Sequence, residues 1–199
     1  MARVPARATG FAALDACLPG GGWPVGALTE IVPACDGLGE LSLVLPALRS
    51  LCEAGRAVAL VNPPYTPYAP ALAKAGLSLD SLLWVHAVRD EEGRWAAEQL
   101  LREGAAAVLL WSSAREERAL RRLQLAAEAG RACAFLYRRR PEGRPQGRIE
   151  PSPAALRVAL YPAEGGLRVE LVKIRGAPAS QVALPLGGSF ARRCGACCG

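Results

Sequence analysis

A glycine-rich turn near the amino end has residue types and spacing that could hold a phosphate. Residues 20–45 read GGGWPVGALTEIVPACDGLGELSLVL, which predicts an apolar strand, a tight turn and an amphipathic helix. A working phosphate-binding loop reads G-x-x-x-x-G-K-[ST], in which the lysine reaches the terminal phosphates and the hydroxyl binds magnesium. Here Glu40 stands at the lysine position and Leu41 at the hydroxyl position. Because a carboxylate repels a triphosphate, we interpret the turn as the frame of a nucleotide site without its chemistry.

The degenerate loop has two interpretations. Its residues Asp36, Gly37, Gly39 and Glu40 precede or begin the predicted helix. An acidic side chain there stabilises a helix through the helix dipole, which gives the loop a structural role. The second interpretation is residual nucleotide binding. We favour the structural role and predict no cofactor.

A basic segment is the second candidate site. Residues 138–153 read RRRPEGRPQGRIEPSP, a composition that predicts a mobile loop. Arginines among prolines and glycines can bind phosphates with little sequence preference. DNA contact, contact with a partner protein and a solvated linker all remain open, and the net charge of +6 is compatible with each. The candidate residues are Arg138, Arg139, Arg140, Arg144 and Arg148.

The cysteines give a weak metal signal. Four of the seven occur singly, and Cys194, Cys197 and Cys198 lie together in a tail, residues 187–199, that we expect to be disordered. One C-x-x-C without a second pair is a poor zinc motif, and the only histidine, His86, lies inside a predicted apolar strand. We therefore predict no metal site.

No apolar run reaches the roughly 20 residues that a membrane helix needs, and no signal peptide is visible. The expectation is a cytoplasmic protein with reduced thiols and no membrane contact.

Strands and helices alternate along the chain, which predicts an α/β fold with a mainly parallel, twisted sheet flanked by helices. After a flexible arm at 1–8, a single domain is expected over 9–186. Its carboxyl end is predicted to form an antiparallel hairpin, at 156–161 and 167–174, and a last strand at 181–186. The other predicted strands are 27–32, 57–61, 82–86, 106–111 and 132–137, and the predicted helices are 40–54, 68–75, 94–103 and 115–129.

Ligands of such sheets bind beyond the carboxyl ends of the strands. Those ends carry residues 33–39, 62–66, 111–114 and 138 onward. Trp23, Trp95 and Trp111 sit at the ends of elements, where an aromatic side chain is either core or an interface anchor, and we expect Trp95 in the core.

Several motifs together carry a resemblance to a known family. They are G-F-x-x-L-D at 10–15, L-P-G-G-G-W-P-x-G-x-L-T-E-I at 18–31, G-x-G-E-L-S-L at 37–43, V-x-x-P-x-x-P-Y-A-P-A-L at 61–72, W-A-x-E-Q-x-L at 95–101 and L-R-R-L-Q-L-A-A-E at 120–128. In this order they resemble ImuA, a RecA-like accessory protein of bacterial translesion DNA synthesis. The resemblance runs from about Thr9 to about Leu186.

The resemblance implies a RecA-like core and a role in SOS-induced, error-prone translesion synthesis. It implies as partners an ImuB-like Y-family protein, an error-prone replicative-type polymerase and RecA, with direct or indirect DNA contact and nucleoid association during DNA damage.

Each catalytic position of RecA is changed in this chain. The loop lysine is replaced at Glu40, the acid expected after the second core strand falls within residues 62–64, and the metal-linked aspartate falls at Leu110, Trp111 or Ser112. Phosphoryl transfer needs positioned cations and a water-orienting group together, so we expect a protein that is not an enzyme. Two alternatives remain: a cell-division inhibitor similar to SulA, which shares the G-x-L-T-E-[IV] strand and binds FtsZ, and a weak ATPase.

Overall fold

A computed structural model describes residues 5–35, 37–138, 152–176 and 178–185. In this part of the chain an eight-stranded sheet has the order β10-β9-β8-β3-β7-β6-β4-β5. The six strands from β8 to β5 are all parallel, and β9 is antiparallel to both β8 and β10. The strands are β3 (Ala27–Pro33), β4 (Val58–Val61), β5 (Leu82–Val85), β6 (Ala107–Trp111), β7 (Cys133–Tyr137), β8 (Leu156–Ala163), β9 (Gly166–Ile174) and β10 (Ser180–Pro185). The predicted mainly parallel α/β sheet with a carboxyl-terminal hairpin is confirmed.

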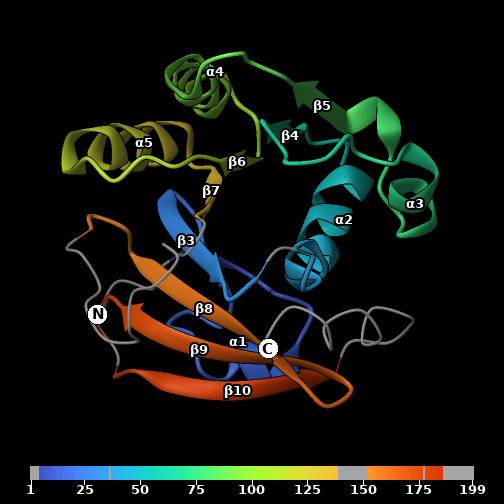
Figure 1. Cartoon of the computed structure of the whole chain (residues 1–199), viewed down its shortest axis with the longest axis vertical. Helices are drawn as coiled ribbons and strands as arrows, with labels where there is room; N and C mark the ends of the chain where they lie inside the picture. The colour runs from blue at the N-terminus through green and yellow to red at the C-terminus, as the bar shows by residue number, and fades with distance from the viewer. Residues whose placement is uncertain (1–4, 36, 139–151, 177, 186–199) are drawn as a thin grey trace.

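Helices cover both faces of this sheet. Figure 1 shows α4 and α5 side by side, with strands of the sheet between them and α2. The helices are α1 (Ala12–Asp15), α2 (Leu45–Glu53), α3 (Ala69–Lys74), α4 (Asp90–Arg102) and α5 (Glu117–Gly130), with short 3-10 helices η1 (Glu40–Leu43) and η2 (Leu79–Ser81). None of these helices is both long and apolar enough to cross a membrane.

The core forms two clusters, one on each face of the sheet. The first lies under α1 and α2 and includes Trp23, whose ring meets Phe135 edge-on with centroids 5.4 Å apart. The second joins α4 and α5 to the opposite face and is rich in alanine. Small side chains let these two helices approach closely, and a Cβ atom on Gly130 would lie 1.7 Å from the carbonyl oxygen of Leu101. Strand β4 is buried along its whole length because helices cover both of its faces.

Two predicted helices have different starts in the structure. The predicted helix 40–54 is interrupted: η1 ends at Leu43, and α2 begins at Leu45 with Pro46 in its first turn, where a residue without an N–H group is tolerated. The predicted helix 94–103 begins earlier, at Asp90. Glu92 and Arg89 form a capping box there, and three acidic residues in the first turn favour the helix dipole.

Two side-chain placements were also predicted wrongly. Trp95 is 60% exposed rather than in the core. Gly93 and Ala97 of α4 face the sheet, and Trp95 lies two positions from each of them. Two positions along an α-helix correspond to a rotation of about 200°, so the Trp95 side chain points away from the sheet. His86 follows β5 instead of lying within it, and it is exposed.

The described part of the amino-terminal arm is structured. Strand β1 (Ala6–Arg7) pairs antiparallel with β2 (Trp23–Pro24). A Cβ atom on Gly22 would lie 2.0 Å from the carbonyl oxygen of Arg7, so glycine allows this close pairing. Residues 5–8 are therefore part of the fold and not of a flexible arm.

Candidate binding pocket at the carboxyl ends of the strands

The carboxyl ends of five parallel strands surround one pocket with a volume of about 410 Å³. We call it the strand-end pocket. The chain segments expected at the binding edge of the sheet therefore do come together. The lining residues are Pro33, Glu40, Asn62, Pro63, Pro64, His86, Ala87, Val88, Asp90, Trp111, Ser112, Ser113, Tyr137 and Arg138.

Glu40 brings a carboxylate into the strand-end pocket. Gly39 precedes it in the left-handed conformation, with φ of 87°, which glycine adopts readily and which turns the chain into η1. The Oε2 atom of Glu40 is buried and has no hydrogen-bond partner among the described residues. Gly37 is exposed with φ of 73°, and Asp36 lies outside the described residues. The structure thus places Glu40, of the four predicted loop residues, in the pocket wall.

Two stacked aromatic rings form another part of the wall. The rings of Trp111 and Tyr137 are nearly parallel, with an interplanar angle of 9° and centroids 4.6 Å apart. The Tyr137 hydroxyl donates to the backbone carbonyl oxygen of Glu40 over 3.4 Å. Burial raises the pKa of Tyr137 well above its ordinary value, and the negative charge of Glu40 raises it further. The phenol therefore remains neutral at physiological pH.

Asn62 has a structural role at the position where a catalytic acid was expected. Its Oδ1 atom accepts a hydrogen bond of 2.7 Å from the Ala87 N–H, and its own N–H donates to the Val85 carbonyl oxygen over 2.9 Å. Asn62 has φ of 52°, a conformation that asparagine tolerates better than most residues. A Cβ atom on Gly93 would lie only 2.4 Å from the Nδ2 atom of Asn62, so a residue without a side chain is needed at position 93. Asn62 thus joins the ends of β4 and β5.

Asp90 is a pocket residue that the sequence interpretation missed. Its Oδ2 atom pairs with Arg94 and accepts hydrogen bonds from Ser112 over 3.0 Å and Ser113 over 3.4 Å. Its charge is therefore compensated within the pocket. The available signal was its position in the short segment between the predicted strand 82–86 and the predicted helix 94–103. Within the described residues, no three His, Cys, Asp or Glu side chains are grouped so that they could hold a metal ion.

Arg138 is the described member of the predicted basic segment, and it lies at the edge of the strand-end pocket. Its Nη1 atom is 3.4 Å from Oε2 of Glu30, a fully buried carboxylate in β3. Arg157 of β8 also pairs with Glu30, over 2.5 Å, and Ser152 donates a hydrogen bond to it. Arg139, Arg140, Arg144 and Arg148 lie outside the described residues. Arg138 therefore belongs to a buried ionic network that we call the Glu30 network, formed by Glu30, Arg138, Ser152 and Arg157.

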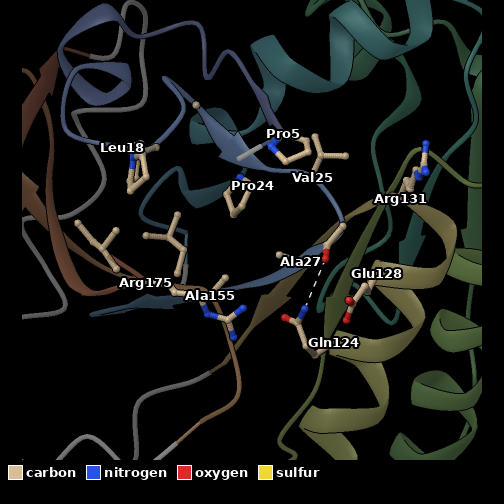
Figure 2. Close-up of a pocket in the computed structure, with 15 residues that line it drawn as sticks. Pro5, Leu18, Pro24, Val25, Ala27, Gln124, Glu128, Arg131, Ala155 and Arg175 are labelled. Carbon is tan, nitrogen blue, oxygen red and sulfur yellow. Dashed lines mark hydrogen bonds between the residues drawn. The ribbon is translucent and has the colours of Figure 1, made fainter. Parts of the chain in front are cut away.

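A larger cavity of about 720 Å³ lies at the opposite edge of the sheet. Figure 2 shows Pro5, Leu18 and Pro24 on one side of it. On another side it shows Gln124 and Glu128 of α5 and Arg131, which directly follows that helix. The Gln124 amide donates to the Gly26 carbonyl oxygen over 3.4 Å and accepts from the Leu28 N–H over 2.9 Å. We place the candidate site in the smaller strand-end pocket because charged and hydrogen-bonding groups converge there, at the edge where such sheets bind ligands.

The fold and the pocket define a mainly parallel α/β domain with a candidate ligand site at its strand ends. No protein-family model matches the chain. The chain is 32% identical over 146 residues to Protein ImuA from two strains of Caulobacter vibrioides, NA1000 / CB15N and ATCC 19089. The match covers 70% of this chain and 60% of each relative. The resemblance to ImuA that the motifs indicated is confirmed.

Proposed function

We propose that this chain is a non-catalytic accessory protein of SOS-induced, error-prone translesion DNA synthesis. The observation that carries the proposal is the similarity to ImuA over 146 residues. The chain matches 60% of the length of these relatives. The activity and the partners of the whole relatives are therefore part of the proposal for this chain. In this role it acts in the cytoplasm and associates with the nucleoid during DNA damage.

The absence of catalysis is part of this proposal, and the geometry of the strand-end pocket supports it. Glu40 contributes a buried carboxylate oxygen where a nucleotide site would need a cation facing the phosphates. Asn62 is engaged with the backbone of Ala87 and cannot activate a water molecule as a carboxylate would. Strand β6 ends at Trp111 and is followed by Ser112, and neither side chain offers a negative charge to magnesium. A protein of this kind acts by binding other proteins.

The proposed partners are an ImuB-like Y-family protein, an error-prone replicative-type polymerase and RecA. The experiment is affinity purification of the tagged chain from DNA-damaged cells of its host, with each of these proteins and FtsZ detected by mass spectrometry. The proposal predicts retention of the ImuB-like protein or RecA. Retention of FtsZ without either would contradict it and favour a cell-division inhibitor.

Phosphate release from ATP tests the proposed lack of catalysis. The purified chain is expected to release phosphate at the same background rate as its Glu40→Ala variant. A higher rate that this substitution abolishes would show that the chain is an ATPase.

A further inference from the structure

The strand-end pocket holds one carboxylate with an oxygen that accepts no hydrogen bond from the described residues. Asp90 is paired with Arg94, and Arg138 is paired with Glu30. Glu40 has no ion pair or hydrogen bond at its buried Oε2 atom. A carboxylate with an unsatisfied buried oxygen is costly. Glu40 as a whole is half-buried, so a cationic ligand in the pocket would compensate its charge from the accessible side.

The aromatic wall limits which cation suits the pocket. Trp111 is partly exposed and stacks on Tyr137, and the Tyr137 hydroxyl contacts the backbone of Glu40. The aromatic pair therefore lies beside the residue that carries the carboxylate. Prolines at the ends of β3 and β4, Pro33, Pro63 and Pro64, add apolar surface. A guanidinium group stacks on aromatic rings, pairs with carboxylates through two N–H groups and is more weakly hydrated than an ammonium group.

We propose that the strand-end pocket binds an arginine side chain of a partner protein, with the guanidinium group paired to Glu40 and held against the ring of Trp111. The pocket volume of about 410 Å³ lies within the range of small-ligand sites and accommodates one long side chain. The inference deepens the proposed function and rests on it for the existence of a protein partner. A phosphate-binding loop carries a lysine that suits an anion, whereas Glu40 at this position suits a cation.

The test uses N-acetyl-arginine N-methylamide as the probe and the citrulline analogue, which has the same shape but no charge, as its control. The indole N–H signal of Trp111 is followed by NMR in the full chain and assigned with Trp111→Phe. We expect a saturable shift with a dissociation constant on the order of 1 mM, as befits a single side chain. The citrulline analogue should bind at least about tenfold more weakly, because it lacks the charge that pairs with Glu40.

Two variants assign this binding to the pocket. Glu40→Gln should raise the dissociation constant of the arginine probe at least about tenfold. Glu53→Gln should leave this constant unchanged, because Glu53 is an exposed helix residue paired with Arg49. Equal binding of the citrulline analogue, or equal binding by Glu40→Gln, would overturn the inference. Saturable binding of tripolyphosphate at the Trp111 signal would also overturn it, because an anion would then occupy the pocket.

Failure of the inference and failure of the proposed function give different results. If the arginine probe does not bind but an ImuB-like protein or RecA still co-purifies, the pocket assignment is wrong and the proposed function stands. If the probe binds as expected but neither protein co-purifies, the cation site stands and the proposed function is wrong.

Discussion

Removing the carboxylate of the Glu30 network should destabilise the fold strongly. The Glu30 side chain is fully buried, and the side chains of its partners Arg157 and Arg138 are 6% and 12% exposed. Glu30→Ala leaves both guanidinium groups buried without their shared carboxylate. Breaking a buried ion pair in this way costs about 3–5 kcal/mol of unfolding free energy. For a domain of this size that corresponds to a fall of roughly 6–20 °C in melting temperature.

Urea denaturation followed by tryptophan fluorescence and circular dichroism measures this loss. Glu53→Ala is the matched control, because it breaks an exposed ion pair with Arg49 and should cost no more than about 0.5 kcal/mol. The triple variant Glu30→Met, Arg138→Met and Arg157→Met removes all three buried charges and should recover a large part of the loss, since apolar replacement of a whole buried ion cluster is often neutral. A Glu30→Ala protein within about 1 kcal/mol of the wild type would refute the reasoning.

Three further predictions concern the core. Burial raises the pKa of Cys133 from 9.0 to about 11, so the unfolded chain loses this proton at lower pH than the folded chain. The free energy of unfolding should therefore fall by up to roughly 3 kcal/mol as the pH rises from 9 to 11. Cys133→Ala should make the free energy of unfolding, measured by denaturation at a series of pH values, less dependent on pH over that range. Trp23→Ala should lower the free energy of unfolding by about 3–5 kcal/mol, and Trp95→Ala should lower it by less than about 1 kcal/mol. Equal losses for the two variants, measured by chemical denaturation, would contradict the burial of Trp23 and the exposure of Trp95. Gly130→Ala should lower the melting temperature, because the added Cβ atom would collide with the Leu101 carbonyl oxygen. Its control, Ala129→Gly, should lower the free energy of unfolding by only about 1 kcal/mol. An unchanged melting temperature of the Gly130→Ala protein would exclude this close contact.

The sheet could be predicted because its strands are continuous apolar runs separated by turn residues. Strand β4, for example, is short, wholly apolar and buried on both faces. The hairpin of β8 and β9 could be predicted from alternation around a glycine turn. Helix starts were less predictable, since Pro46 and the acidic residues after Arg89 act through local capping that apolar periodicity does not reveal.

The chemistry of the site was only partly predictable. Glu40 was identified because the phosphate-loop pattern fixes its position, but the aromatic stack beside it joins the ends of two separate strands. The Glu30 network was missed, although a glutamate within an apolar strand and an arginine within another were visible signals of a buried pair. Trp95 was misplaced because an aromatic residue among alanines suggests a core position unless the direction of its helix face is known.

The most direct test of the proposed function is the frequency of damage-induced mutation in the host of this chain. A strain lacking the gene should show little increase in mutation after ultraviolet irradiation, and the wild-type gene should restore the increase. Restoration by a gene that encodes Glu53→Gln but not by one that encodes Glu40→Gln would connect the strand-end pocket to this role. An unchanged frequency of induced mutation in the deletion strain would contradict the proposal that the chain acts in error-prone synthesis.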